Sequence, residues 1–392
     1  MTGERTSSFL ANFLLLSVVS GLTVGLGKIV TTLYALSLGA TPFQIGVVSA
    51  MESIGMVFVT VPAGFIIARY GARGVYFFSS LGPMLVNLLM PLSGSWLALA
   101  AGRWFIGLCI PFRMVSMNSA FLERLDRIGH GKAGWYRASL TGGMAIVAPA
   151  LASVLTGRWS VAAIFWAVAA LFAIMALFSL SFLPSRDPAA QPGDISVVAE
   201  LQLLVANSRI AESCLIEFAS AATNALFTTF VIVLAASLPG LTAQDGIHVM
   251  LFQGVAVVTM LFLAGPIVAR IGVRTAYGVS LAAAAAALIT FGLAQGFPHL
   301  ALGAALLSIG SALVHLVNVR MLASLPGGKS KVAGLYNLAS MTGSSAGAIL
   351  GGLLSKLVTL QSVFLLWLPL LLIAALLIRA LADTPRIATG DA

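Results

Sequence analysis

The most regular feature of this chain is a series of long apolar stretches separated by short polar ones. Each stretch is long enough as a helix, at about 1.5 Å per residue, to cross a hydrocarbon core about 30 Å thick. The apolar positions are continuous rather than alternating, which favours helices over barrel strands, because a helix satisfies its own backbone in lipid. We therefore predict twelve transmembrane helices, at 9–36, 42–68, 75–92, 96–121, 138–156, 160–183, 210–236, 246–269, 275–294, 298–323, 333–356 and 360–382.

Composition supports the membrane assignment. Apolar residues make up 59% of the 392 residues and charged ones 8%, against about 45–50% and 25% in soluble domains. The first span is too long for the core of a signal peptide and lacks a convincing cleavage site, so we expect it to be retained. Cys109 and Cys214 both fall within spans, so no disulfide framework is implied.

The basic residues predict the orientation. With the N-terminus inside, 16 of the 21 Lys and Arg residues fall in cytoplasmic termini and loops, while Arg158 and Lys356 fall outside. This asymmetry is the positive-inside rule, and it explains the net charge of +9 without invoking nucleic acid. We predict a multi-pass protein of the cytoplasmic (inner) membrane with both termini in the cytoplasm.

An internal repeat organises the chain. The stretch "AGFIIARYGARGVY" at 63–76 shares eight of its fourteen positions with "AGPIVARIGVRTAY" at 264–277, at an offset of 201. Two shorter echoes, "AGWY" at 133 with "AGLY" at 333 and "ASLTG" at 138 with "ASMTG" at 339, have nearly the same offset. The sequence therefore predicts six helices duplicated in parallel.

The repeat divides the chain into two halves. We predict a six-helix bundle over 1–183 and a second over 210–392, joined by a cytoplasmic linker at 184–209 that is rich in Pro, Gly and charged residues. The linker segment Ile195–Val205 has the composition of a short interfacial helix.

The repeated loop carries a family resemblance. The pattern G-x-x-x-A-R-x-G-x-R after the second and eighth spans resembles the signature loop of the major facilitator superfamily, G-x-x-x-D-R-x-G-R-R, although Ala68 and Ala72 replace its Asp and first Arg. The resemblance implies an all-α fold and a secondary transporter that works by alternating access. It assigns a gating role to Gly64, Arg69, Gly71, Arg73, Gly265, Arg270, Gly272 and Arg274. The alternative is that these arginines are only topology signals.

Two weaker patterns of the same superfamily are present. "RWFIG", from Arg103 to Gly107, resembles R-x-x-q-G, and "GSSAGAILGG", from Gly343 to Gly352, has the spacing of an exporter motif with Ala348 in place of Pro. The second pattern favours export. The alternative is that these glycines only let helices pack closely in lipid.

Within this resemblance, spans 1, 4, 7 and 10 line a central cavity. Polar side chains fall on one face of each of spans 1, 7 and 10, within about 60–80° of arc. They are Ser17, Ser20, Lys28 and Thr31; Ser213, Glu217, Asn224 and Thr228; and Ser308, Ser311, His315 and Asn318.

Charged residues inside spans are costly, so each is a functional hypothesis. Lys28, Glu52 and Arg103 lie at similar depths near the midplane. One interpretation is a fixed ion pair between Lys28 and Glu52, and the other is that Glu52 takes up and releases protons. The repeat places Gln253 at the equivalent of Glu52.

A second charged layer lies toward the cytoplasmic side. Arg113, Glu217 and His315 fall there, and Glu217 with His315 or Arg113 is a candidate proton or substrate station. Together we expect Lys28, Arg103, Arg113, Asn224, His315 and Asn318 to bind substrate, and Glu52, Glu217 and His315 to couple protons. A His in a helix can also be a simple packing residue.

The two charged layers contain three fixed positive charges and two carboxyls. This excess of positive charge over Glu52 and Glu217 favours an anionic substrate. We predict a monomeric, proton-coupled antiporter that exports a small organic anion or anionic amphiphile, with no cofactor and no metal. The alternatives are a multidrug antiporter for lipophilic cations and a non-transporting receptor or membrane enzyme on the same fold. No nucleotide-binding motif or catalytic motif occurs in the sequence, so ATP-driven transport and enzyme activity are not expected.

Overall fold

The structure is a computed structural model that describes residues 2–122, 124, 135–183, 208–324 and 329–383, and every regular element in these ranges is helical. The all-α fold with twelve membrane helices is confirmed. One of the twelve is built from three consecutive segments, and a short 3-10 turn, η1 (Met90–Leu92), extends another. The helices are α1 (Thr2–Ser37), α2 (Pro42–Tyr70), α3 (Ala72–Leu89), α4 (Trp96–Leu122), α6 (Trp135–Gly142) with η3 (Gly143–Val147) and α7 (Ala148–Leu155), α8 (Val161–Phe182), α10 (Ser208–Ser237), α11 (Ala243–Ile271), α12 (Val273–Gly292), α13 (Phe297–Ser324), α14 (Lys329–Leu354) and α15 (Leu360–Asp383).

Eleven of these helices are long and apolar enough to cross a membrane within the described residues. The remaining long helix, α14, is less apolar because Gly, Ser, Thr and Asn occupy many of its positions. Small residues of this kind allow close helix packing. The composition of α14 thus suits a helix that is enclosed by protein rather than lipid.

The repeat is visible in the backbone. Among the described residues, four have a positive φ angle, all of them glycines, and they form two pairs at an offset of 201: Gly39 with Gly240, and Gly71 with Gly272. Gly71 and Gly272, at φ 82° and 79°, connect α2 to α3 and α11 to α12. Glycine is favoured there because other residues meet a steric penalty at positive φ.

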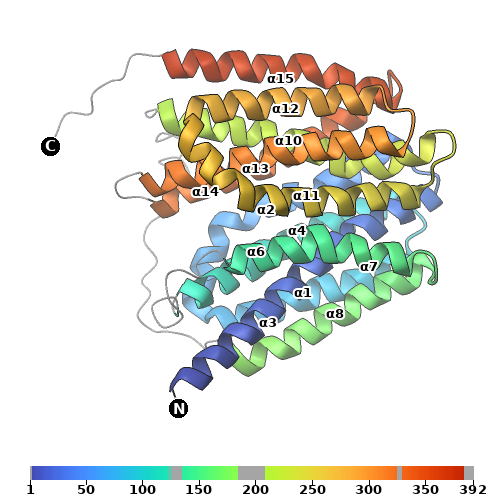
Figure 1. Cartoon of the computed structure of the whole chain (residues 1–392). Helices are drawn as coiled ribbons and strands as arrows, with labels where there is room; N and C mark the ends of the chain where they lie inside the picture. The colour runs from blue at the N-terminus through green and yellow to red at the C-terminus, as the bar shows by residue number, and fades with distance from the viewer. Residues whose placement is uncertain (1, 123, 125–134, 184–207, 325–328, 384–392) are drawn as a thin grey trace.

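The helices form two six-helix bundles that lie side by side (Figure 1). In the first, α3 packs against α4 and α8, and α1 against α6, η3 and α8; in the second, α10 packs against α14 and α15, and α12 against α13. The beginning of α1 and the end of α15 lie at the same end of the molecule (Figure 1). Most of the predicted linker falls on 184–207, outside the described residues, so the domain boundaries and the short linker helix stay predictions.

The fifth membrane helix is interrupted by a π-helical turn, η3. Pro149 has no amide hydrogen, so it cannot donate to the carbonyl of Ala145 four residues earlier. That carbonyl instead faces α11, where a Cβ on Gly254 would collide with it. A proline in one bundle and a glycine in the other thus let η3 and α11 approach closely.

The bundles meet along two seams at the end opposite the beginning of α1. In the first, between α2 and α14, a Cβ at Gly46 would meet the carbonyl oxygen of Ala348, and the ammonium of Lys356 lies 3.5 Å from the ring centroid of Phe43. In the second, between α7 and α11, the amide of Gln244 donates to the carbonyl oxygen of Ser153 at 2.6 Å. We call these contacts the outer seams, because the orientation predicted from the basic residues places this end away from the cytoplasm.

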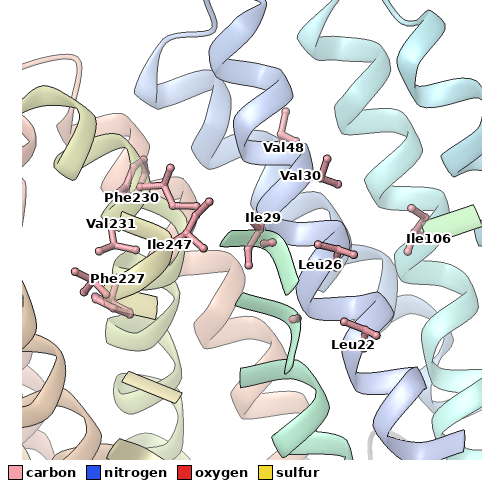
Figure 2. Packing of buried hydrophobic residues seen from close by; sticks show 14 of the residues in the cluster. Leu22, Leu26, Ile29, Val30, Val48, Ile106, Phe227, Phe230, Val231 and Ile247 are labelled. Atoms are coloured by element: carbon pink, nitrogen blue, oxygen red, sulfur yellow. The ribbon is translucent and has the colours of Figure 1, made fainter. Parts of the chain in front are cut away.

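A continuous apolar cluster joins the bundles behind the seams. Figure 2 shows buried side chains of α1, among them Leu22, Leu26 and Ile29, in the same cluster as Phe227, Phe230 and Val231 of α10. This core holds α1 and α10 in place. It therefore positions the polar side chains that these two helices carry.

Candidate substrate and coupling site

The first group of intramembrane charges is a three-residue cluster around Glu52. The carboxylate forms ion pairs with Arg103 of α4 through Oε2 and with Lys28 of α1 through Oε1, the latter at 3.4 Å. The Lys28–Glu52 ion pair considered from the sequence is therefore present, and Arg103 is a second cation bound to the same carboxylate. With Glu52 ionised, the cluster carries one net positive charge.

Close backbone packing brings Glu52 and Arg103 together. A Cβ on Gly107 would overlap the carbonyl oxygen of Glu52, and a Cβ on Gly55 would meet the carbonyl oxygen of Trp104. Each glycine thus lets α2 and α4 touch at the depth of the ion pair. In the "RWFIG" stretch, Gly107 lets α2 and α4 approach closely, and this brings Arg103 within reach of the Glu52 carboxylate.

The three charged side chains differ in exposure. The side chains of Glu52 and Arg103 are 2% and 5% exposed, whereas that of Lys28 is 46% exposed. Glu52 and Arg103 are therefore held inside the bundle, and Lys28 is the member of the cluster that a solute can reach.

Arg113 occupies a different place from the one expected. It lies inside the first bundle, 2% exposed, where its Nη2 donates to Ser20 Oγ at 2.8 Å and its guanidinium carbon lies 4.7 Å from the ring centroid of Phe172. Among the described residues no ion pair or hydrogen bond joins it to Glu217 or His315. The structure thus does not assemble the expected station of Arg113 with Glu217, and substrate binding by Arg113 stays a prediction.

A polar network links three helices of the second bundle. The hydroxyl of Tyr277 on α12 donates to Asn318 Oδ1 at 2.8 Å and lies 3.0 Å from Ser213 Oγ. Asn318 Nδ2 on α13 in turn donates to Glu217 Oε2 on α10 at 2.8 Å. The polar stripes predicted Ser213, Glu217 and Asn318 but missed Tyr277, whose identity with Tyr76 across the repeat was the available signal.

The other predicted cavity residues lie nearby. Asn224 Nδ2 on α10 donates to Ser311 Oγ on α13 at 2.6 Å, so the predicted stripes of these two helices face each other. His315 is partly buried on α13, and Arg137 of the first bundle lies close enough for their charges to interact.

The predicted gating loops lie at the ends of α2 and α11. Arg73 Nε donates a hydrogen bond to the carbonyl oxygen of Leu183 at 2.6 Å. Leu183 is the C-cap residue of α8. Cations near a helix C-terminus stabilise its unpaired carbonyls. Arg69, Arg270 and Arg274 are exposed, Gly64 lies within α2, and Gly265 lies within α11 with open space beside it. These positions fit both a gate and a topology signal, so the gating role stays a prediction.

Comparison with known proteins agrees with this architecture. The sequence profile described as "Major Facilitator Superfamily" matches residues 9–263 and 213–391. The chain belongs to this superfamily. Superfamily members are membrane transporters, so the chain is a multi-pass membrane transporter. A search of curated protein sequences gave no significant match.

Solved superfamily structures share the fold. A mutant form of the nucleoside transporter NupG has a TM-score of 0.81 at 19% identity, covering 94% of this chain and 99% of that one. A bacterial homologue of the human lysosomal transporter Spinster, inward-facing and occupied, has a TM-score of 0.80 at 13% identity, with 98% and 99% covered. The human organic anion transporter MFSD10 has a TM-score of 0.63 at 17% identity, with 96% and 99% covered. At these identities the likeness extends to the fold alone.

Proposed function

We propose that this superfamily member is a proton-coupled secondary transporter of a small organic anion or anionic amphiphile, which binds at Lys28. The observation that carries the proposal is that the buried carboxylate of Glu52 is shared by Arg103 and Lys28. One cation of the cluster is therefore not neutralised. Because Lys28 is the exposed member, an anion has access to it.

The depth of Lys28 supports a position in a central cavity. Lysine at the centre of a membrane helix costs roughly 2.5–3.5 kcal/mol on insertion scales, so such a side chain usually faces the protein interior or a water-filled space. Both outer seams hold the two bundles together at one end of the molecule. A solute at Lys28 would therefore enter from the opposite, predicted cytoplasmic, end.

Glu52 is the proposed proton carrier. While ionised, it holds Lys28; once protonated, it releases Lys28 for the substrate anion, because a neutral carboxyl attracts an ammonium far less. This order favours proton and anion moving together. Export by antiport, the direction expected from the α14 glycines, instead requires Glu52 to lose its proton when the anion binds. The glycines themselves have a packing role, since Gly343 and Gly347 lie against the α10 backbone.

The first experiment finds the anion. Purified protein is heated with organic anions, including carboxylate chelators and phosphates, and separately with lipophilic cations. A ligand at about 100 times its Kd adds roughly 2.7 kcal/mol to the stability of the native state if the unfolded chain does not bind it. Stabilisation by an anion is expected. Lys28→Met should weaken binding at least tenfold, and Arg158→Gln, which removes an exposed cation from an outer loop, should not.

The second experiment tests coupling in liposomes. With the anion identified, a pH gradient should drive its accumulation by the wild type, and Glu52→Gln should bind the anion but not accumulate it. Accumulation by Glu52→Gln equal to that of the wild type would reject Glu52 as the proton carrier. The sign of the gradient that drives accumulation separates symport from antiport.

The multidrug alternative rests on Glu217. This carboxylate accepts a hydrogen bond from Asn318 and forms no ion pair among the described residues, so it is available to a cation. Stabilisation by lipophilic cations alone, lost in Glu217→Gln, would favour that function over anion transport.

A further inference from the structure

The interior of the first bundle contains a cation, Arg113, that no carboxylate pairs with among the residues that the structure describes. Arg113 of α4 is enclosed by α1, α3 and α8, with Ser20 at its Nη2, Phe172 beside its guanidinium and Met175 Sδ at 4.0 Å. The described part of this bundle has two acidic residues, Glu4 in the first turn of α1 and Glu52. Glu52 is paired with Arg103 and Lys28. Among the side chains that the structure describes in this bundle, no carboxylate forms an ion pair with Arg113.

Three buried donor atoms of α4 have no hydrogen-bond partner within the described part of the chain. Arg113 Nε and Nη1 are inaccessible to solvent and make no hydrogen bond, and the same holds for the hydroxyl of Ser116. Residues three apart on a helix lie on the same face. The unpaired nitrogens and the hydroxyl therefore belong to side chains on the same face of α4.

Packing alone does not explain this arrangement. An unpaired buried donor destabilises the folded state, a charged one does so more strongly, and a buried charge without a counter-ion is costlier still. The repeat places Val314, a buried apolar residue, at the equivalent position of α13. The second bundle thus fills this place with a small apolar side chain, so the fold itself does not require an arginine.

We propose that Arg113 and Ser116, next to Ser20, bind a small inorganic monoanion of the halide type inside the first bundle. A bound water would accept hydrogen bonds but leave the positive charge of Arg113 uncompensated. A halide accepts hydrogen bonds and also compensates that charge. A monatomic ion fits the place better than a carboxylate, because Tyr76, Phe172 and Met175 enclose the guanidinium. The site is distinct from Lys28, so it does not rest on the proposed transport function.

The test compares anions at constant ionic strength. Thermal unfolding of the purified full-length protein is followed in increasing sodium bromide or chloride against sodium gluconate. We expect a saturable rise of the unfolding midpoint with halide. Ser116→Ala should shift the half-saturating halide concentration upward several-fold, and Arg113→Met should abolish the halide response. Arg158→Gln removes an exposed cation and should keep the wild-type response.

Bromide also allows a direct location of the site. In crystals grown with sodium bromide, an anomalous peak within hydrogen-bond distance of Arg113 and Ser116 is expected. Absence of both the halide-specific rise and the peak would overturn the proposal, and so would a rise that persists unchanged in Arg113→Met and Ser116→Ala. An equal rise with sodium acetate that Arg113→Met abolishes would identify a carboxylate as the ligand and also overturn it.

Discussion

Tyr76 and Tyr277 occupy the same place in the two bundles, yet their side chains face groups of different charge. Tyr76 on α3 lies beside the buried Arg113, whose guanidinium carbon is 5.8 Å from its ring centroid. Tyr277 on α12 donates to Asn318, which in turn binds the carboxylate of Glu217. The duplicated fold has thus kept one aromatic scaffold and placed a cation in one bundle and an anion in the other.

This relationship predicts unequal effects of removing the two hydroxyls. Tyr277→Phe leaves Asn318 Oδ1 without its donor, and an unsatisfied buried group costs about 1–3 kcal/mol. The hydroxyl of Tyr76 donates to the thioether sulfur of Met175 at 3.8 Å, a weak acceptor, so Tyr76→Phe should cost less. The midpoints of thermal unfolding of the two purified variants measure the difference. Equal losses would show that the hydrogen bond of Tyr277 to Asn318 contributes no more to stability than the weak contact of Tyr76 with Met175.

The element plan could be predicted from the sequence because it depends on composition and periodicity. Continuous apolar stretches identify the spans, and the offset of 201 pairs Gly71 with Gly272, which share a positive φ. Boundaries differ from the prediction by a few residues, or by up to seven at the start of α1. The π-helical turn at Gly143–Val147 was missed, because it depends on a glycine of the other bundle as well as on Pro149.

The orientation of Arg113 could not be predicted in the same way. In a soluble protein the apolar face of a helix points to the core, but a membrane helix is apolar over most of its circumference, so hydrophobicity alone does not indicate which face meets which neighbour. The sequence placed Arg103 and Arg113 at two depths of one helix, and it did not show which neighbouring helices surround each of them. The ion pair of Arg103 and the enclosure of Arg113 depend on α2 and α8, which are distant in sequence.

The two cations that bind Glu52 should contribute unequally to stability. Arg103→Gln leaves a buried carboxylate with one partner, and breaking a buried pair typically costs about 3–5 kcal/mol. Lys28 is nearly half exposed, so Lys28→Gln should cost less than about 1 kcal/mol. Thermal unfolding of both variants without ligand tests this order. A loss in Lys28→Gln as large as that in Arg103→Gln would contradict the distinction between a buried pair and an accessible cation.

The repeated glycines allow a test of backbone strain alone. Gly265 and Gly272 both have open space where a Cβ would stand, but only Gly272 of these two has a positive φ. Gly272→Ala should therefore destabilise the protein by about 1–2 kcal/mol. Gly265→Ala, within α11, should stabilise it by about 0.5–1 kcal/mol. Opposite shifts of the unfolding midpoint are the expected result, and a stabilised Gly272→Ala would rule out the strained turn.

The outer seam between α2 and α14 should control which end of the transporter is open. The Cα atoms of Gly46 and Gly352 pack so closely that any side chain at either position meets the backbone of the other helix. Gly46→Leu should force the seam apart and shift the population toward an outward-open state. Spin labels at Thr41 and Leu357, in a background without the native cysteines, report the separation of the two helix ends.

The control is Gly74→Leu, on α3, where nothing lies within 4 Å of the added Cβ. It should leave the label distance unchanged. For Gly46→Leu we expect a second, longer distance to appear. Alternating access requires a state open at the outer end and a state open at the opposite end. The variant should therefore also transport more slowly if it rarely closes at the outer end. A single, unchanged distance in folded Gly46→Leu would mean that the seam yields locally and that another contact holds the outer end closed.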